Sequence, residues 1–197
     1  MKRIFSHLKN LLHTVESYPD AHLVSRAQKG DTEAFGKLYM KYIDGIFRFL
    51  YIRTGYQQEE AEDLTEMVFY KAWEHISRFK GDGEHVKAWL FTIARNRLTD
   101  YYRAYKKHTD VSEHLADEST KPEDTTYHLM LRDDIRRALQ ELTYDQKELI
   151  SLKFIEGLSN QEIAQIIGKR EDAIRQQQKR ALARLQQILK QKGYGKQ

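Results

Sequence analysis

The chain contains 197 residues, of which 40% are hydrophobic and 31% are charged, and its formal net charge at pH 7 is +4. This composition predicts a chain that dissolves in water and folds around apolar cores, and no stretch approaches the roughly 20 apolar residues needed to cross a bilayer. Cysteine is absent, which excludes disulfides and thiolate zinc sites and fits a reducing compartment. Since the N-terminus also has no continuous apolar stretch, the sequence predicts a cytoplasmic protein with neither an export signal nor stable membrane insertion.

Apolar residues recur with a period near 3.6 along most of the chain, and prolines are rare. The sequence therefore predicts an all-α protein. Its first element, residues 4–18, gathers its isoleucine and leucines on one face and ends before Pro19. We interpret residues 1–19 as an accessory amphipathic helix that docks on protein, with attachment to a membrane surface as the alternative.

A helical unit is predicted over residues 20–106. Asp20 can cap its first helix, and Gly30 and Asp31 end that helix and cap a second one, from about Thr32 to Thr54. Most aromatic residues of the second helix keep helical spacing, so we expect them in the core. Its apolar positions are Phe35, Leu38, Tyr39, Tyr42, Ile46, Phe47 and Leu50.

The third predicted helix, residues 58–77, combines a buried stripe with an acidic exposed face. The buried stripe consists of Ala61, Leu64, Val68, Ala72 and Ile76. The acidic face consists of Glu59, Glu60, Glu62, Asp63 and Glu66. Such a face can steer a basic protein surface towards it, and Phe69 or Tyr70 could supply an aromatic anchor. A solvated face without a partner is the alternative interpretation.

A loop with Gly81 and Gly83 leads into the fourth predicted helix, from about Val86 to Tyr105. This helix buries Trp89, Leu90, Ile93 and Ala94 and carries polar and basic residues towards its C-terminal half. Among the latter are Arg95, Asn96, Arg97 and Arg103. The helical spacing of Trp89 from Ile93 favours a core position over a base-stacking platform. The four helices together can close one core.

Residues 107–127 hold no sustained apolar period and are interpreted as a flexible acidic linker. Between His108 and Thr126, six acidic residues stand against one lysine, a balance of −5. The predicted architecture is therefore two small helical domains joined by this linker.

The second unit is predicted over residues 128–197 and contains a helix-turn-helix. Thr143 and Gln146, and again Ser159 and Glu162, stand at the spacing of a capping box. The helix after Ser159 is short and ends at Gly168, and a longer helix follows. A short capped helix, a glycine turn and a second helix with a basic side is the order of a helix-turn-helix.

The basic side of that last helix is the predicted DNA-binding surface. From Gly168 to Gln197, nine Lys or Arg residues stand against Glu171 and Asp172, a balance of +7. The donors that we expect to meet phosphates and base edges are Lys169, Arg170, Arg175, Gln176, Lys179 and Arg180. A basic solvated helix in an ordinary bundle is the alternative.

Taken together, residues 20–105 and 128–190 resemble the extracytoplasmic-function group of the bacterial sigma-70 factors. The stretch Ala61–Trp73 is similar to the acidic and aromatic segment of sigma region 2. The stretch Trp89–Asn96 is similar to the segment that opens and reads the minus-ten element. The pair formed by Ser159–Ile167 and Ala173–Leu182 is similar to the helices of sigma region 4 that read the minus-thirty-five element.

The resemblance implies a transcription initiation factor that binds core RNA polymerase and promoter DNA. It implies polymerase contacts for Glu62, Asp63, Glu66, Phe69 and Tyr70. It implies minus-ten contacts for Arg95, Asn96, Arg97 and Arg103, and minus-thirty-five contacts for the six donors from Lys169 to Arg180. It also implies control by an anti-sigma partner.

Three positions depart from the family's pattern. Glu66 replaces a common glutamine in the polymerase-binding segment, and Thr143 follows Leu142 where a proline is usual. Arg170 stands where a serine often caps the recognition helix, which leaves the start of that helix uncertain by a residue or two.

Two other classes of function compete with this interpretation. An autonomous helix-turn-helix regulator would explain residues 128–190 but not the acidic third helix or the basic fourth helix. An enzyme is the weaker alternative, because the eight histidines are scattered and no phosphate loop or nucleophile motif is present. The sequence predicts no catalytic, cofactor-binding or metal site, and His108 and His114 are expected to be solvated.

Overall fold

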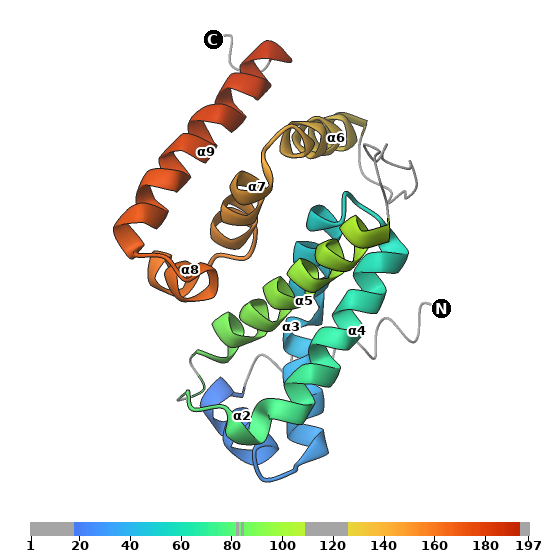
Figure 1. Ribbon diagram of the computed structural model, residues 1–197, viewed down its shortest axis with the longest axis vertical. Helices are drawn as coiled ribbons and strands as arrows, with labels where there is room; N and C mark the ends of the chain where they lie inside the picture. Colours follow the sequence, from blue (N-terminus) through green and yellow to red (C-terminus); the bar gives the residue numbers. More distant parts are fainter. Residues whose placement is uncertain (1–17, 82, 84, 109–125, 194–197) are drawn as a thin grey trace. The chain divides into compact units, whose positions relative to one another are not determined.

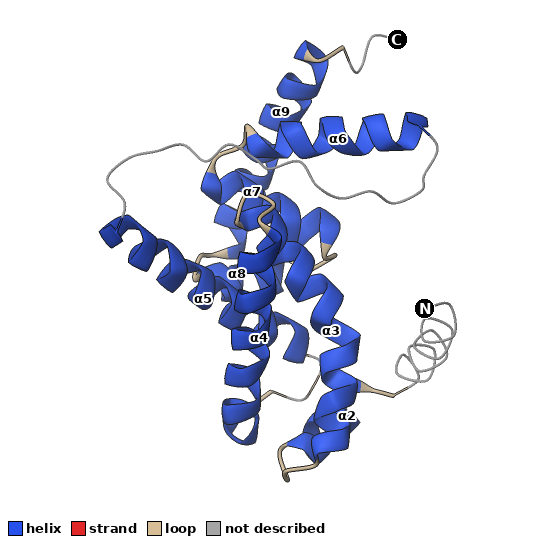
Figure 2. Ribbon diagram, turned by 90° about the vertical axis from the view of Figure 1, so that its right-hand side faces the viewer, coloured by secondary structure: helices blue, strands red, loops and turns tan. Residues whose placement is uncertain are grey.

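The computed structural model describes residues 18–81, 83, 85–108 and 126–193, and within these ranges it contains helices and no strand (Figure 1, Figure 2). The elements are α2 (Asp20–Ala27), α3 (Thr32–Arg53), α4 (Gln58–His75), the 3-10 turn η1 (Ile76–Arg78), α5 (Val86–His108), α6 (Thr126–Gln140), α7 (Tyr144–Ile150), the π-helical turn η2 (Ser151–Ile155), α8 (Asn160–Ile167) and α9 (Glu171–Gln191). The predicted all-α class is confirmed.

Two predicted segments lie almost entirely outside the described residues: the accessory helix at 4–18 and the linker at 107–127. The rest of the chain divides into two compact units, each with its own core. The first contains α2, most of α3, α4 and α5, and the second contains α6 to α9 together with Tyr51–Gln57. Among the described helices, none has both the length and the apolar character of a membrane-spanning segment.

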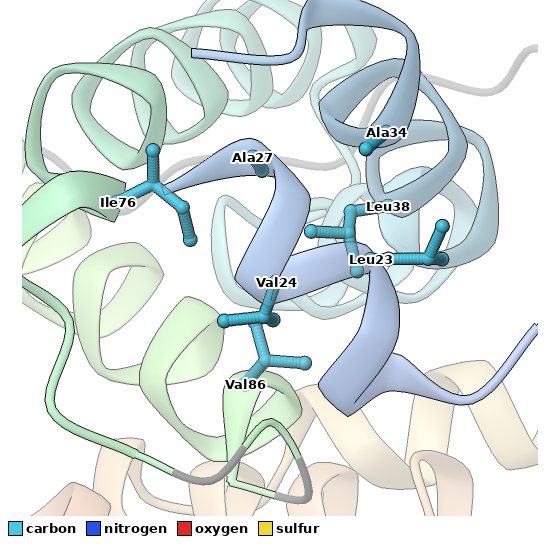
Figure 3. Packing of buried hydrophobic residues seen from close by; sticks show 7 residues of the cluster. All are labelled: Leu23, Val24, Ala27, Ala34, Leu38, Ile76 and Val86. Carbon is cyan, nitrogen blue, oxygen red and sulfur yellow. The ribbon is translucent and has the colours of Figure 1, made fainter. Parts of the chain in front are cut away.

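The short helix α2 closes one end of the first unit. It lies against the start of α3, the turn η1 and the start of α5 (Figure 3). The cluster consists of Leu23, Val24, Ala27, Ala34, Leu38, Ile76 and Val86, all buried. Each buried Leu, Ile or Val side chain contributes about 1.5–3 kcal/mol to folding, so α2 adds to the core although it is only 8 residues long.

The rest of the first core lies between the long helices, where α4 packs along α5. Phe49 of α3 meets Phe91 of α5 edge to face, with ring centroids 5.5 Å apart. The whole stripe predicted to be buried on the third helix is buried, from Ala61 to Ala72 on α4 and at Ile76 in η1. Phe91, which the spacing argument did not select, is also buried.

Asp20 does not cap α2, and that prediction was wrong. Pro19 occupies the cap position of α2 without a side-chain bond, and Asp20 lies in the first turn. Its carboxylate accepts hydrogen bonds from Lys41 Nζ at 2.7 Å and from the hydroxyl of Tyr42. The carboxylate therefore joins α2 to α3. Its two oxygens accept hydrogen bonds from side chains of α3 and not from the N–H groups at the start of α2.

Asp31 caps α3 as predicted. Its carboxylate accepts a hydrogen bond from Ala34 N at 3.0 Å and one from Arg26 Nε at 2.7 Å. The backbone hydrogen bond from Ala34, followed by the bond from Arg26, lowers the pKa of Asp31 below its ordinary value of 3.8. The charged carboxylate thus satisfies one of the donors at the start of a 22-residue helix.

The loop after η1 is fastened to the helices on both sides. Gln28 at the end of α2 donates from Nε2 to the carbonyl of Phe79 at 2.7 Å. The Phe79 ring lies on Trp89 of α5, with centroids 4.9 Å apart. Gly83 is buried with φ +87°, and a Cβ there would lie 2.2 Å from the Cα of Ala21. Trp89 therefore packs against protein, as its spacing predicted.

The second unit is built from short, capped helices. A reciprocal capping box of Thr143 and Gln146 begins α7, as predicted. The core joins α6, α7 and α9 through Ala138, Leu139, Leu142, Ile150, Ala181 and Ile188. Below about 15 residues an isolated helix is marginal in water, so α7 and α8 depend on these caps and on the apolar face that they share with α9.

We expect Gly83→Ala to destabilise the first unit more than Gly30→Ala. Both glycines have φ +87°, but a Cβ at Gly30 meets nothing within 4 Å. The left-handed backbone alone costs an L residue about 1–2 kcal/mol, and the clash with Ala21 should add about 1–3 kcal/mol. Urea unfolding followed by tryptophan fluorescence reports on this unit alone, because both tryptophans lie in it. If the two variants lost the same free energy of unfolding, the close contact between Gly83 and Ala21 would be contradicted.

The Asp31 cap predicts a defined pH dependence of stability. Since the pKa of Asp31 is lowered in the folded state, its stabilisation is present above the ordinary value and is lost as the pH falls through the folded value. The difference in unfolding free energy between the wild type and Asp31→Ala should hold from pH 7 to pH 5 and shrink towards pH 3. Asp44→Ala, which removes an exposed carboxylate of the same helix, should show no such trend.

Candidate nucleic-acid interface

The helix pair predicted at the C-terminal end is formed by α8 and α9. Ser159 and Glu162 make the predicted capping box: Ser159 N donates to Glu162 Oε2 at 2.7 Å, and Glu162 N donates to Ser159 Oγ at 3.1 Å. Gly168 ends α8 in the left-handed conformation, with φ 73° and ψ 35°, and donates to the carbonyl of Ala164 at 2.9 Å. The chain then passes through Arg170 in extended conformation and enters α9.

Only one stripe of α9 faces the core. Ile174, Ala181 and Ile188 are fully buried, and Gln178 between them is 8% exposed. Leu182, directly after Ala181, is 41% exposed. It lies about 100° around the helix from Ala181, so the contact of α9 with α6, α7 and α8 covers only one of these two positions.

The opposite side of α9 is basic and open to solvent. All six predicted donors are exposed: Lys169, Arg170, Arg175, Gln176, Lys179 and Arg180. Gln176, Lys179 and Arg180 share one face, since residues three and four apart are neighbours on a helix. The structure thus brings these side chains together, while their contact with DNA stays a prediction.

Two of the arginines on this surface pair with acidic residues of the first turn of α9. Arg175 Nη2 lies 2.6 Å from Glu171 Oε1, and Arg170 Nη2 lies 3.1 Å from Asp172 Oδ2. Exposed pairs of this kind contribute little to folding. Both guanidinium groups stay exposed at the start of α9, where a phosphate or a guanine edge can compete for the same donors.

Arg170 replaces a capping side chain at the start of this helix. It occupies the cap position without a side-chain hydrogen bond, as the sequence led us to expect. Asp172 and Glu171 place negative charge in the first turn, where it complements the helix dipole. The structure places the first residue of the helix at Glu171.

In the first unit, the exposed side of α4 changes along the helix from acidic to apolar residues. Its N-terminal half exposes the acidic residues Glu59, Glu62, Asp63 and Glu66, and its C-terminal half exposes Met67, Tyr70 and Trp73. Met67 and Trp73 were missed in the sequence analysis, although both lie at helical spacing from Tyr70. The surface therefore offers charge and apolar area side by side, as protein interfaces do.

Phe69 and Tyr70 were both candidates for the aromatic anchor, and the structure separates them. Phe69 is 4% exposed and packs edge to face against Tyr39, with centroids 4.7 Å apart. Tyr70 is 66% exposed. Phe69 is thus a core residue, because Tyr39 of α3 covers its side of α4, and Tyr70 is the exposed candidate of the two.

The four polar residues predicted on α5 differ in exposure. Asn96 and Arg103 are exposed, whereas Arg95 and Arg97 are half-buried. Asn96, Asp100 and Arg103 share one face of α5 by their spacing, and Arg103 Nη1 lies 3.5 Å from Asp100 Oδ1. Their contact with DNA stays a prediction.

The chemistry of these surfaces is that of recognition. The exposed guanidinium, ammonium and amide groups of α9 are of the kinds that can donate hydrogen bonds to phosphates and base edges. Within the described part of the chain, His, Asp and Glu nowhere gather in threes as a metal site requires.

Comparison with known proteins identifies both units. Residues 38–108 match the family model of sigma-70 region 2, and residues 132–185 match that of sigma-70 region 4. The chain is 38% identical over 171 residues to the ECF RNA polymerase sigma factor BldN of Streptomyces coelicolor, covering 85% of this chain and 64% of BldN. It is 30% identical to the RNA polymerase sigma-H factor of Pseudomonas aeruginosa, covering 75% of this chain and 82% of that factor.

Solved structures give the same answer for the fold. The sigma factor RpoE of Bartonella quintana, crystallised with the anti-sigma factor NepR, matches with a TM-score of 0.65 and 26% identity over 79% of this chain and 96% of that one. CnrH, in complex with the cytosolic domain of CnrY, matches with a TM-score of 0.68 over 88% of this chain and 98% of that one. At 24% identity the second match concerns the fold alone.

Both family models match in order along one chain, and a relative at 30% identity is covered over most of its length. The chain therefore belongs to the extracytoplasmic-function group of the sigma-70 family of RNA polymerase sigma factors.

Proposed function

We propose that this chain binds core RNA polymerase and directs it to a specific set of promoters as a transcription initiation factor. The observation that carries the proposal is the joint presence of region 2 and region 4 matches, each on a unit with a solvent-exposed charged helix. An autonomous helix-turn-helix regulator would not account for region 2, and the family match does not favour it. Factors of this family are not enzymes.

In this proposal residues 20–106 act as sigma region 2 and residues 128–197 as sigma region 4, with 107–127 as the connecting linker and 1–19 as an accessory helix. The chain would act in the cytoplasm, where RNA polymerase is found. An anti-sigma factor would control it, as the neighbour RpoE is seen with the anti-sigma factor NepR.

The polymerase-binding surface lies on α4. Glu62, Asp63 and Glu66 supply negative charge that steers a basic surface of the enzyme towards it. Tyr70, with Met67 and Trp73 beside it, supplies the apolar centre. Aromatic side chains are enriched among the residues that carry most of the binding free energy at protein interfaces.

In this proposal α5 binds the minus-ten element and α9 binds the minus-thirty-five element. Arg95, Asn96, Arg97 and Arg103 would hold the backbone and an unstacked base of the opened strand. The donors from Lys169 to Arg180 would enter the major groove with α9. Affinity for the second element should fall steeply with salt, because phosphate contacts release counterions.

Transcription in vitro tests the proposal as a whole. Purified core RNA polymerase is incubated with a genomic fragment library with and without the full chain, and the start sites of the transcripts are mapped. We expect new start sites that share two sequence blocks upstream. A chain that shifts DNA as a dimer but never programmes polymerase would overturn the proposal.

Tyr70→Ala should weaken assembly with core polymerase by at least about 2 kcal/mol, the cost of removing a binding hot spot. Its unfolding free energy should stay near that of the wild type, because the ring is exposed. Phe69→Ala is the matched control: it removes a buried ring and should cost about 3–5 kcal/mol of folding free energy. Fluorescence anisotropy of labelled chain against core polymerase measures the first quantity. If Tyr70→Ala bound core polymerase with the affinity of the wild type, the assignment of α4 to the polymerase interface would be wrong.

Arg175→Ala should weaken binding to the minus-thirty-five element by about 1–3 kcal/mol and relax specificity at one base pair if the guanidinium forks a guanine. Arg184→Ala removes an exposed arginine farther along α9 and serves as the control. Binding to a set of duplexes with single base changes measures both effects. If Arg175→Ala bound the whole set as the wild type does, Arg175 would not be a base-reading residue.

A further inference from the structure

Gln178 is a polar residue in the middle of an apolar stripe. On α9, Ile174 precedes it by one turn and Ala181 follows it, and both are fully buried, whereas Gln178 is 8% exposed. A leucine would fill such a position without needing a hydrogen bond. Burial of an amide costs free energy unless its polar atoms find partners, so its presence here calls for a specific role.

The partner of Gln178 is Asn160, the first residue of α8. Gln178 Nε2 donates to Asn160 Oδ1 at 3.0 Å across 18 positions of the sequence. Asn160 directly follows Ser159, whose capping box fixes the local backbone. The bond therefore connects a rigid point at the start of α8 to the middle of α9.

This connection is directional, unlike the apolar contacts between the two helices. Ile163 and Ile166 of α8 and Ile174 of α9 are buried, and apolar contacts of this kind tolerate sliding and rotation. A hydrogen bond requires a distance near 3 Å and a nearly linear donor angle. The amide pair thus fixes the rotation of α9 about its own axis relative to α8.

Rotation of α9 matters because the exposed donors lie on both sides of Gln178 in the sequence. Arg175 and Gln176 precede it, and Lys179 follows it directly. With side chains about 5–6 Å from the helix axis, a rotation of 10° displaces them by about 1 Å. Recognition geometry tolerates displacements of about 0.5 Å, so a small rotation is enough to lose a bidentate contact with a base.

We infer that the Gln178–Asn160 hydrogen bond determines promoter specificity by setting the rotation of α9 on α8. Gln178 is a positioning residue in this inference, since its amide acts through the donors beside it. The inference rests on the proposed function of α9 in binding the minus-thirty-five element. Loss of the bond should reduce discrimination between DNA sequences while leaving phosphate attraction intact.

The test uses the full chain and a duplex library randomised over eight positions. The consensus selected by the wild type and a shuffled version of it are the two probes, and the ratio of their dissociation constants measures discrimination. For Gln178→Leu we expect this ratio to fall about tenfold, with affinity for the shuffled duplex unchanged. The unfolding temperature by circular dichroism should be equal to or above that of the wild type, because a leucine suits the stripe.

A double-mutant cycle identifies the amide pair as the cause. Asn160→Ala should reduce discrimination about as much as Gln178→Leu, and the double variant should lose no more than either single variant. Gln186→Leu makes the same replacement at an exposed position of α9 and should change neither quantity. Additive losses in the double variant would overturn the inference.

The remaining outcomes separate this inference from the proposed function. If the wild type selected no consensus, the assignment of α9 to promoter recognition would fail, and the inference with it. If the wild type discriminated and Gln178→Leu discriminated equally well, the inference alone would fail. If Gln178→Leu and Asn160→Ala both lost affinity for the shuffled duplex together with their helical signal, the role of the bond would be structural, which also overturns it.

Discussion

The direction in which α9 leaves α8 depends on the backbone conformation of Gly168, with φ 73° and ψ 35°. In this left-handed region an L side chain costs about 1–2 kcal/mol. The N–H groups of Gly168 and Lys169 both donate to the carbonyl of Ala164, at 2.9 and 3.1 Å. These bonds close α8, and Arg170 then turns the chain into α9 in extended conformation. The turn sets the direction of the α9 axis relative to α8, and the rotation of α9 about that axis depends in addition on the Gln178–Asn160 hydrogen bond.

The two charged helices use the same construction with opposite chemistry. Both α4 and α9 bury one side, which is wider on α4 than on α9, and expose charged residues on the other. The exposed part of α4 is acidic and then aromatic, which suits a basic protein surface and would be repelled by phosphates. The exposed part of α9 is basic and rich in amides, which suits the major groove. The two helices therefore differ in the charge of the partner that each can attract, although their construction is alike.

Local signals in the sequence were enough for the helix ends and for the basic face. The caps at Thr143 and Ser159 and the turn at Gly168 depend on neighbours within four residues, and all three are confirmed. The errors concern partners that are distant in sequence. Asp20 finds Lys41 instead of its own helix, and of the adjacent rings at 69 and 70 only the first faces Tyr39. Helical spacing gives the direction of a stripe but not its width, which depends on the helix packed against it.

In each unit, a glutamine amide links two elements that are distant in the sequence. In the first unit, Gln28 donates from Nε2 to the carbonyl of Phe79 at 2.7 Å and fastens the start of the glycine loop to α2. In the second unit, Gln178 donates to Asn160 at 3.0 Å and fastens α8 to α9. Recognition by a preformed surface loses less conformational entropy than recognition by a surface that must order on binding. Gly83 of the same loop is buried against Ala21, and a Cβ at this position would lie 2.2 Å from the Cα of Ala21, so the close approach of this glycine to α2 depends on the absence of a side chain.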